Sequence, residues 1–154
     1  MTAWAVALAA AALLAVILFG PRVLISRAQN GLARNLMDSK GAALRLLTRA
    51  EMVAGAYRRI PGVLAFEADV LAFTGVHGDS CVLPMASVQK IATGRRLAAG
   101  RMLFRREVVR LTRTDGEEVE FVVSPASAHA WRSHLGLWAG RERQAAAETV
   151  TPGR

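Results

Sequence analysis

The stretch that decides the fold of the domain is Val63-Leu64-Ala65-Phe66-Glu67-Ala68-Asp69-Val70-Leu71-Ala72-Phe73-Thr74-Gly75. Two apolar runs, each ending in or containing aromatic residues, flank the short segment Glu67-Ala68-Asp69, and this order is typical of a β-hairpin. The stretch therefore predicts two antiparallel strands at the start of a sheet.

Five further apolar runs follow the hairpin at close spacing. We expect strands at residues 81–84, 88–93, 102–104, 108–112 and 118–123. Asp115-Gly116 lies between the last two, and Asp-Gly is a strong signal for a tight hairpin turn. Seven short strands predict an antiparallel sheet that closes into a barrel or a sandwich.

The pattern then changes to that of a helix. Ser124 is a good N-cap and Pro125 a good first helical residue. Spacings of three, four and three residues place four apolar side chains on one face: Ala128, Trp131, Leu135 and Trp138. We expect this face to plug one end of the barrel, and residues 141–154 to form a flexible tail.

The N-terminus carries the clearest signal for location. Residues 1–21 contain no charged side chain, and about 20 helical residues cross the apolar core of a bilayer. The predicted single span presents Trp4, Leu8, Leu13, Leu14, Ile17, Leu18 and Phe19. A cleaved signal peptide fits less well, because no basic side chain precedes Trp4 and Gly20-Pro21 makes a poor cleavage site.

Residues 22–59 contain eight basic and two acidic residues, out of a net charge of +8 for the chain. Because basic flanks stay in the cytoplasm, we expect the N-terminus outside and the rest of the chain inside the cell. The segment reads as a basic helical stalk with a break near 38–41, ended by Pro61-Gly62. The stalk either lies on anionic headgroups or packs on the domain.

The sequence contains no recognisable motif for catalysis or for cofactor binding. Cys81 is the single cysteine, so no internal disulfide or cysteine-based zinc site is expected. His129 and His134 are five residues apart, which is not the spacing of two ligands on one helical face. Phosphate-binding and nucleophile-elbow motifs do not occur. We therefore expect a protein that is not an enzyme and holds no cofactor or metal.

Several of these segments together resemble a known family. They are Pro61–Phe66 running into Val70–Gly75, then 82–88, then 110–123 with Thr114-Asp115-Gly116, and the helix with Ala130-Trp131 and Leu135. This pattern resembles bacterial pleckstrin-homology (PH) and GRAM-type proteins with an N-terminal membrane anchor. The resemblance covers residues 60–138 and predicts a PH-like domain over residues 60–140. The resemblance implies a seven-stranded PH-like barrel capped by a C-terminal helix, and a scaffold that binds lipids, peptides or proteins.

One feature departs from the lipid-binding members of that family. Phosphoinositide-binding PH domains carry basic residues across the first hairpin, whereas this hairpin turns through acidic Glu67 and Asp69. The positive charge lies instead on Arg95, Arg96, Arg101, Arg105, Arg106, Arg110 and Arg113. This candidate face would bind an anionic headgroup or an acidic partner, or would serve as a charged edge that prevents aggregation.

These observations predict a membrane-anchored binding module of α+β class, mainly β, with the bilayer as its first partner. Its function is expected to be that of a protein-interaction module or an accessory subunit at the cytoplasmic membrane face. The alternative is an anionic-lipid sensor that uses the basic stalk and the arginine face. Nucleic-acid binding is a weaker alternative, because the chain has few aromatic residues suited to stacking on bases.

Overall fold

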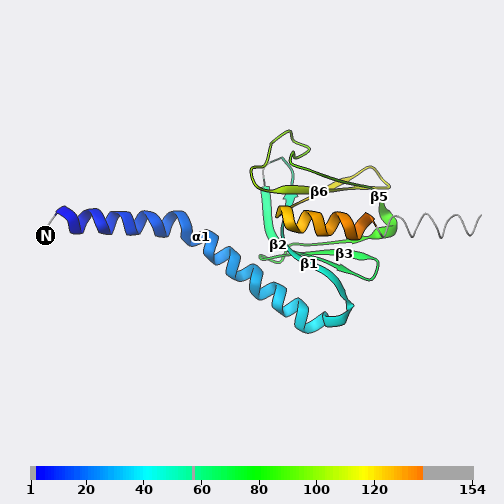
Figure 1. The fold of residues 1–154 in the computed structure, drawn as a ribbon, viewed down its shortest axis with the longest axis horizontal. Helices are drawn as coiled ribbons and strands as arrows, with labels where there is room; N and C mark the ends of the chain where they lie inside the picture. The colour runs from blue at the N-terminus through cyan, green and yellow to red at the C-terminus, as the bar shows by residue number, and fades with distance from the viewer. Residues whose placement is uncertain (1–2, 57, 137–154) are drawn as a thin grey trace, which may run out of the picture.

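The computed structural model describes residues 3–56 and 58–136. These residues form a long N-terminal helix, a seven-stranded antiparallel sheet and a helix over residues 125–136. The α+β class, mainly β, is therefore confirmed. Figure 1 shows the N-terminal helix extending away from the sheet and the C-terminal helix lying against the sheet.

Helix α1 runs over Ala3–Lys40. Among the described residues it is the one helix that is long enough and apolar enough to cross a membrane. Its 38 residues extend about 57 Å at 1.5 Å per residue, about twice the apolar thickness of a bilayer. Pro21 lies inside the helix, and Figure 1 shows the axis changing direction about halfway along. The half before Pro21 is exposed, whereas the half after it reaches the sheet.

Helix α1 ends at Lys40, inside the predicted break near 38–41, but the predicted second stalk helix is wrong. A short 3-10 turn, η1 (Gly41–Ala43), leads directly into strand β1 (Leu44–Ala54). Leu, Ala, Arg and Glu favour a helix locally. Pairing with neighbours on both sides overrides that preference, since β1 pairs with β2 along its length and with β7 at its end.

The remaining strands confirm most of the predicted runs. They are β2 (Arg58–Glu67), β3 (Val70–Gly75), β4 (Ser80–Pro84), β5 (Val88–Gly94), β6 (Glu107–Arg113) and β7 (Glu118–Val123), and the 3-10 turn η2 (Met85–Ser87) lies between β4 and β5. The order across the sheet is β4-β3-β2-β1-β7-β6-β5. The Asp115-Gly116 turn is confirmed, with Gly116 at a φ of +85°.

The predicted strand at 102–104 is wrong. Only a single bridge between Arg96 and Met102 forms there, inside a loop over residues 95–106 that joins β5 to β6. Leu103 is buried while Met102 and Phe104 on either side are exposed. The sheet still has seven strands, because β1, which the sequence pattern predicts as part of a helix, takes the place of this run.

Pro61 and Gly62 lie inside β2 and do not end a helix. A Cβ on Gly62 would collide with the carbonyl oxygen of Thr74 and the ring of Phe73 on β3. The carbonyl of Pro61 accepts a hydrogen bond from Val76 N at 2.8 Å, beyond the end of the β2–β3 ladder. Proline is tolerated there because its missing N–H lies outside the ladder.

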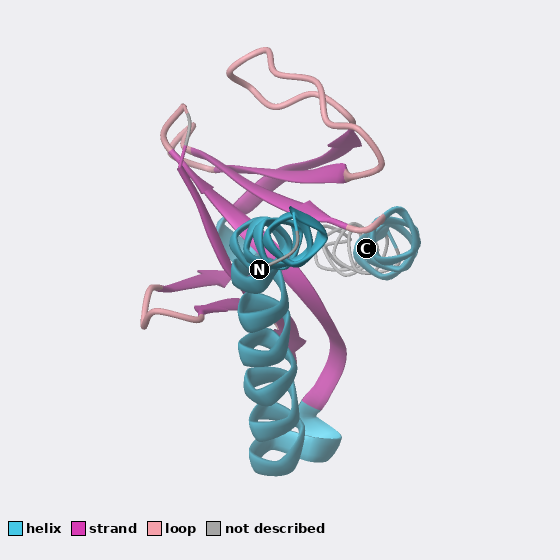
Figure 2. Cartoon of the chain, turned by 90° about the vertical axis from the view of Figure 1, so that its left-hand side faces the viewer, coloured by secondary structure: helices cyan, strands magenta, loops and turns pink. Residues whose placement is uncertain are grey.

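The sheet curves around a core that the C-terminal helix closes (Figure 2). Ser124 caps this helix as predicted, since Ser127 N donates to Ser124 Oγ at 3.1 Å. Ala128, Trp131 and Leu135 are buried, and the ring of Trp131 meets Phe66 edge-on at 6.5 Å. The predicted core position Trp138 and the tail 141–154 lie outside the described residues.

Candidate functional site

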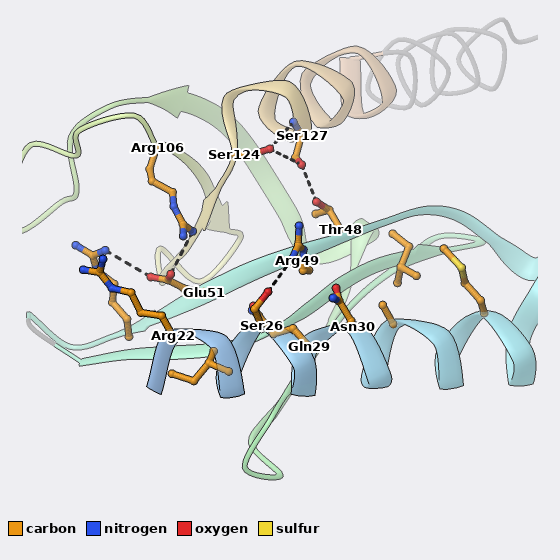
Figure 3. A pocket seen from close by; sticks show the side chains of 15 residues that line it. Arg22, Ser26, Gln29, Asn30, Thr48, Arg49, Glu51, Arg106, Ser124 and Ser127 are labelled. Atoms are coloured by element: carbon orange, nitrogen blue, oxygen red, sulfur yellow. Dashed lines mark hydrogen bonds and ion pairs between the residues drawn. The ribbon is translucent and has the colours of Figure 1, made fainter. Parts of the chain in front are cut away.

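A polar groove of about 840 Å³ lies between the second half of α1 and the sheet. We call it the α1–β1 groove. Its walls come from α1, β1, β2, the end of the β5–β6 loop and the start of the C-terminal helix (Figure 3). The lining residues are Arg22, Ile25, Ser26, Gln29, Asn30, Ala33, Met37, Leu47, Thr48, Arg49, Glu51, Arg59, Arg106, Ser124 and Ser127.

Hydrogen bonds between α1 and the sheet hold the two walls of the groove together. Gln29 Nε2 donates to the carbonyl oxygen of Gly62 at 2.8 Å and to that of Ala50 at 3.2 Å. Arg49 Nη1 donates to Ser26 Oγ at 3.1 Å. Of the two interpretations of the basic stalk, the structure therefore bears out packing on the domain, at least for this part of α1.

Positive charge dominates the end of the groove around Glu51. Glu51 pairs with Arg106 at 3.1 Å and with Arg59 at 3.4 Å, through different carboxylate oxygens. Figure 3 shows the side chain of Arg22 reaching from α1 to the same end of the groove. Among the described lining residues Glu51 is the only acid, so the arginines retain a surplus of positive charge.

Hydroxyl groups line the opposite rim. Thr48 Oγ1 donates to Ser127 Oγ at 2.7 Å, and Ser127 Oγ lies 2.8 Å from Ser124 Oγ. Both serines belong to the first turn of the C-terminal helix, where the backbone carries a partial positive charge. The groove thus combines guanidinium groups, hydroxyl groups and a helix N-terminus, all of which favour an anion over a cation.

The structure divides the predicted arginine face into three parts. Arg110 pairs with the buried Glu120 of β7 at 2.7 Å, and Arg113 pairs with Asp115 at 3.0 Å and with Glu117. These two arginines are neutralised within the sheet. Arg106 belongs to the α1–β1 groove. The other four, Arg95, Arg96, Arg101 and Arg105, are exposed on the β5–β6 loop and form no ion pair with any described residue.

The β5–β6 loop is firmly attached to the sheet. Leu97 and Leu103 are buried in a small second cluster with Val108 and Val122, on a part of the sheet away from the main core. Ala98 N donates to Glu120 Oε1 at 2.9 Å, and Arg110 Nη2 to the carbonyl oxygen of Arg96 at 3.2 Å. The exposure of side chains on this loop therefore follows from its fixed conformation.

Two large apolar side chains project from this loop. Met102 is 67% exposed and Phe104 is 92% exposed. A hollow of about 370 Å³ beside them is lined by Arg95, Met102, Leu103, Phe104, Arg105, Arg106 and Pro125. Sequence reasoning missed this feature because the run Met102-Leu103-Phe104 resembles a strand. The signal that pointed to it is the arginines on both sides of the run.

The predicted span residues lie on the exposed half of α1. Trp4, Leu8, Leu13, Leu14, Ile17, Leu18 and Phe19 are all more than half exposed. Contact with water would leave this apolar surface uncovered, whereas the acyl chains of a bilayer would cover it. The half-buried residues of α1 after Pro21 lie at helical spacing along one face, and they are Ser26, Gln29, Leu32, Ala33 and Leu36.

Groups for catalysis or metal binding are few. Within residues 3–56 and 58–136, no three His, Cys, Asp or Glu side chains come together as a metal site. Cys81 on β4 is half-buried, and this burial raises the pKa of its thiol. Arg113 opposes the rise and Glu117 adds to it, both more weakly than burial does. A raised thiol pKa disfavours the reactive thiolate.

Comparisons with known proteins concern the fold alone. No protein-family model and no curated protein matches this chain. A solved structure, the C-terminal domain of an unknown protein from Leishmania infantum, matches with a TM-score of 0.54 and 12% identity. The match covers 71% of this chain and 96% of that domain. At this identity the likeness concerns the arrangement of strands and helices alone.

Proposed function

We propose that this chain is a single-pass membrane protein whose PH-like domain, on the cytoplasmic side, binds the phosphate group of an anionic phospholipid in the α1–β1 groove. The observation that carries the proposal is the surplus of arginines around Glu51, at a groove that begins with Arg22. Arg22 is the first charged residue after the apolar half of α1. A groove that starts there opens at the level of the headgroups.

The chemistry of the groove suits a phosphate. Guanidinium groups bind phosphate oxygens through paired, charge-assisted hydrogen bonds. Arg59 and Arg106 are already oriented by Glu51, so less side-chain entropy is lost when a ligand binds. On the opposite rim Thr48 donates to Ser127, and of the two serine hydroxyl groups one donates to the other, so one serine proton stays free to donate to the ligand.

The excess of basic residues after the span supports a cytoplasmic domain. The sheet order and the closing helix support the PH-like assignment, because a four-stranded and a three-stranded half meet through β1 and β7. The ligand position would differ from that of phosphoinositide-binding PH domains. Acidic Glu67 and Asp69 flank the turn at the usual place, and Lys40 of α1 pairs with Glu67.

The test uses the full chain in detergent, titrated separately with three probes. Dioctanoyl phosphatidylglycerol should raise the midpoint of thermal unfolding in a salt-sensitive manner, because a ligand that binds the folded state stabilises it. Dioctanoyl phosphatidylcholine should not. Inorganic phosphate is the third arm. An equal effect of inorganic phosphate would assign the groove to a free anion, and no effect of any probe would refute the proposal.

Three variants sharpen this test. Arg22→Gln and Arg59→Gln should each weaken binding of phosphatidylglycerol about tenfold to a hundredfold, since a charge-assisted hydrogen bond contributes roughly 1.5–3 kcal/mol. Glu51→Gln should strengthen binding, because it removes the negative charge that competes with the ligand. Arg34→Gln is the matched control, since Arg34 is exposed on α1 and does not line the groove.

A second candidate function is protein interaction as an accessory subunit of a membrane complex. The observation in its favour is the outer edge of β4, which no other described strand covers. Val82 on this strand is 63% exposed. Uncovered edges accept an additional strand from a partner. A photo-crosslinking residue at Val82 in native membranes should then give one discrete adduct, and no adduct would argue against this function.

A further inference from the structure

We infer that the β5–β6 loop is a membrane-docking loop: Phe104 and Met102 insert into the interface of the bilayer that α1 crosses, and Arg95, Arg101 and Arg105 contact anionic headgroups around them. This surface adjoins the α1–β1 groove at Arg106, which lines both hollows, but Phe104, Met102, Arg95, Arg101 and Arg105 do not line the groove. It recognises the bilayer as a surface, whereas the groove recognises one phosphate group.

The first argument is the exposure of apolar side chains on a loop that is held in place. Phe104 is 92% exposed although Leu103 beside it is 6% exposed. The backbone closes on itself through Leu103 N to the carbonyl oxygen of Arg95 at 2.8 Å and Leu97 N to that of Arg101 at 3.0 Å. A fixed loop that displays a phenylalanine to solvent is costly unless another apolar phase covers it.

The second argument is the position of the loop. Figure 1 shows it at the end of the domain that faces the apolar half of α1, together with the β1–β2 turn. Figure 2 views the molecule from that side and shows the loop facing the viewer, above the end of α1. The β6–β7 turn, which contains Thr114, lies at the opposite end of the domain.

The third argument is the charge around the apolar tip. Arg95, Arg101 and Arg105 are exposed and form no ion pair with the described part of the chain. Arginines that flank an exposed aromatic residue match a bilayer interface, where the ring enters the acyl boundary and the guanidinium groups meet phosphates. Each basic residue near an anionic leaflet adds to the attraction, and salt screens it.

The test measures the depth of the loop directly. The full chain carries Cys81→Ala and one spin-labelled cysteine in place of Phe104, in phosphatidylcholine vesicles that contain phosphatidylglycerol. A label at Thr114 is the matched control at the far end of the domain. We expect the label at 104 to be reached by oxygen and protected from a water-soluble nickel chelate, and the label at 114 to show the reverse. Equal exposure of both labels to the chelate would overturn the inference.

Two variants distinguish docking from ligand binding. Arg101→Gln with Arg105→Gln should return the label at 104 to water, whereas Arg22→Gln should leave its depth unchanged. Phe104→Ser should leave phosphatidylglycerol binding in detergent unchanged, and Val82→Ser serves as its control at another exposed apolar side chain. A label at 104 that stays in water while phosphatidylglycerol still binds would refute the docking loop alone. The reverse result would refute the groove alone.

Discussion

The side-chain amide of Gln29 donates a 2.8 Å hydrogen bond to the carbonyl oxygen of Gly62, and so ties helix α1 to the centre of the sheet. Gly62 lies on β2, where the absence of a side chain lets β3 approach closely. The same amide donates to the carbonyl oxygen of Ala50 on β1. One polar side chain thus joins α1 to two neighbouring strands and positions one wall of the α1–β1 groove.

Replacement of Gln29 by Ala should loosen α1 from the sheet. It removes two hydrogen bonds to backbone carbonyls, each contributing about 0.5–1.5 kcal/mol, so we expect stability to fall by about 1–3 kcal/mol. Thermal unfolding of the detergent-solubilised chain measures the change. Asn35→Ala is the control, because Asn35 is exposed on the same helix. Equal effects of both substitutions would show that the hydrogen bonds of Gln29 contribute nothing.

Gly62→Ala should be severely destabilising. The added methyl group would overlap the carbonyl oxygen of Thr74, the ring of Phe73 and the Cα of Gly75, and two of these atoms belong to backbone that cannot move aside. We expect a loss of about 3 kcal/mol or more. Gly94→Ala should change stability by less than about 1 kcal/mol, because nothing lies within 4 Å of its added carbon. A tolerated Gly62→Ala would contradict the close approach of β2 and β3.

Arg110→Ala should destabilise the sheet more than Arg113→Ala does. Arg110 neutralises Glu120, which is 6% exposed, and also holds the carbonyl oxygen of Arg96. Leaving this carboxylate without its partner should cost about 2–3 kcal/mol, at the low end for buried pairs because Arg110 is itself partly exposed. Arg113 pairs with exposed acids, and its removal should cost less than about 1 kcal/mol.

The substitution Arg110→Ala should also loosen the β5–β6 loop. Ala98 N donates to Glu120, so a displaced carboxylate releases this amide. Hydrogen exchange at Ala98 should therefore accelerate in Arg110→Ala and stay unchanged in Arg113→Ala. Unchanged exchange in both variants would mean that the loop is held by Leu97 and Leu103 alone.

Cys81 should make the protein less stable at high pH. Burial raises the pKa of its thiol above the ordinary value of 9.0, so the unfolded chain loses this proton first as the pH rises. Below pH 9.0 the thiol is protonated in both states and its contribution is complete; above that pH, stability falls until the folded thiol also ionises. Urea unfolding across this range measures the slope. Cys81→Ala should remove this part of the slope, and an unchanged slope would assign it to other groups.

Local patterns in the sequence sufficed for much of the fold. The Val63–Gly75 hairpin, the Asp115-Gly116 turn, the Ser124 cap and the buried Trp131 could all be predicted, because each depends on residues close together in the chain. The apolar half of α1 is likewise a property of composition, and needs no partner within the protein to be recognised.

Strand β1 shows where local pattern fails. Leu44–Ala54 has helix-forming residues and no clear alternation, since it lies between β2 and β7 and most of its side chains are partly buried on both faces. Its conformation is decided by hydrogen bonds to strands up to about 70 residues away in sequence. The opposite error occurs at Met102-Leu103-Phe104, where the pattern predicts a strand and the structure has a loop. Only Leu103 of this run is buried in a core.

The sequence by itself determined that this protein has one apolar segment long enough for a membrane, a basic stretch after it and a mainly β domain. Only the tertiary structure decided which arginines are free to bind. Arg110 and Arg113 meet acids on neighbouring segments, Arg22, Arg59 and Arg106 converge near Glu51, and Arg95, Arg101 and Arg105 surround Phe104 on an exposed loop. The reason is physical: charge is a property of each residue, whereas pairing and exposure depend on what the fold places beside it.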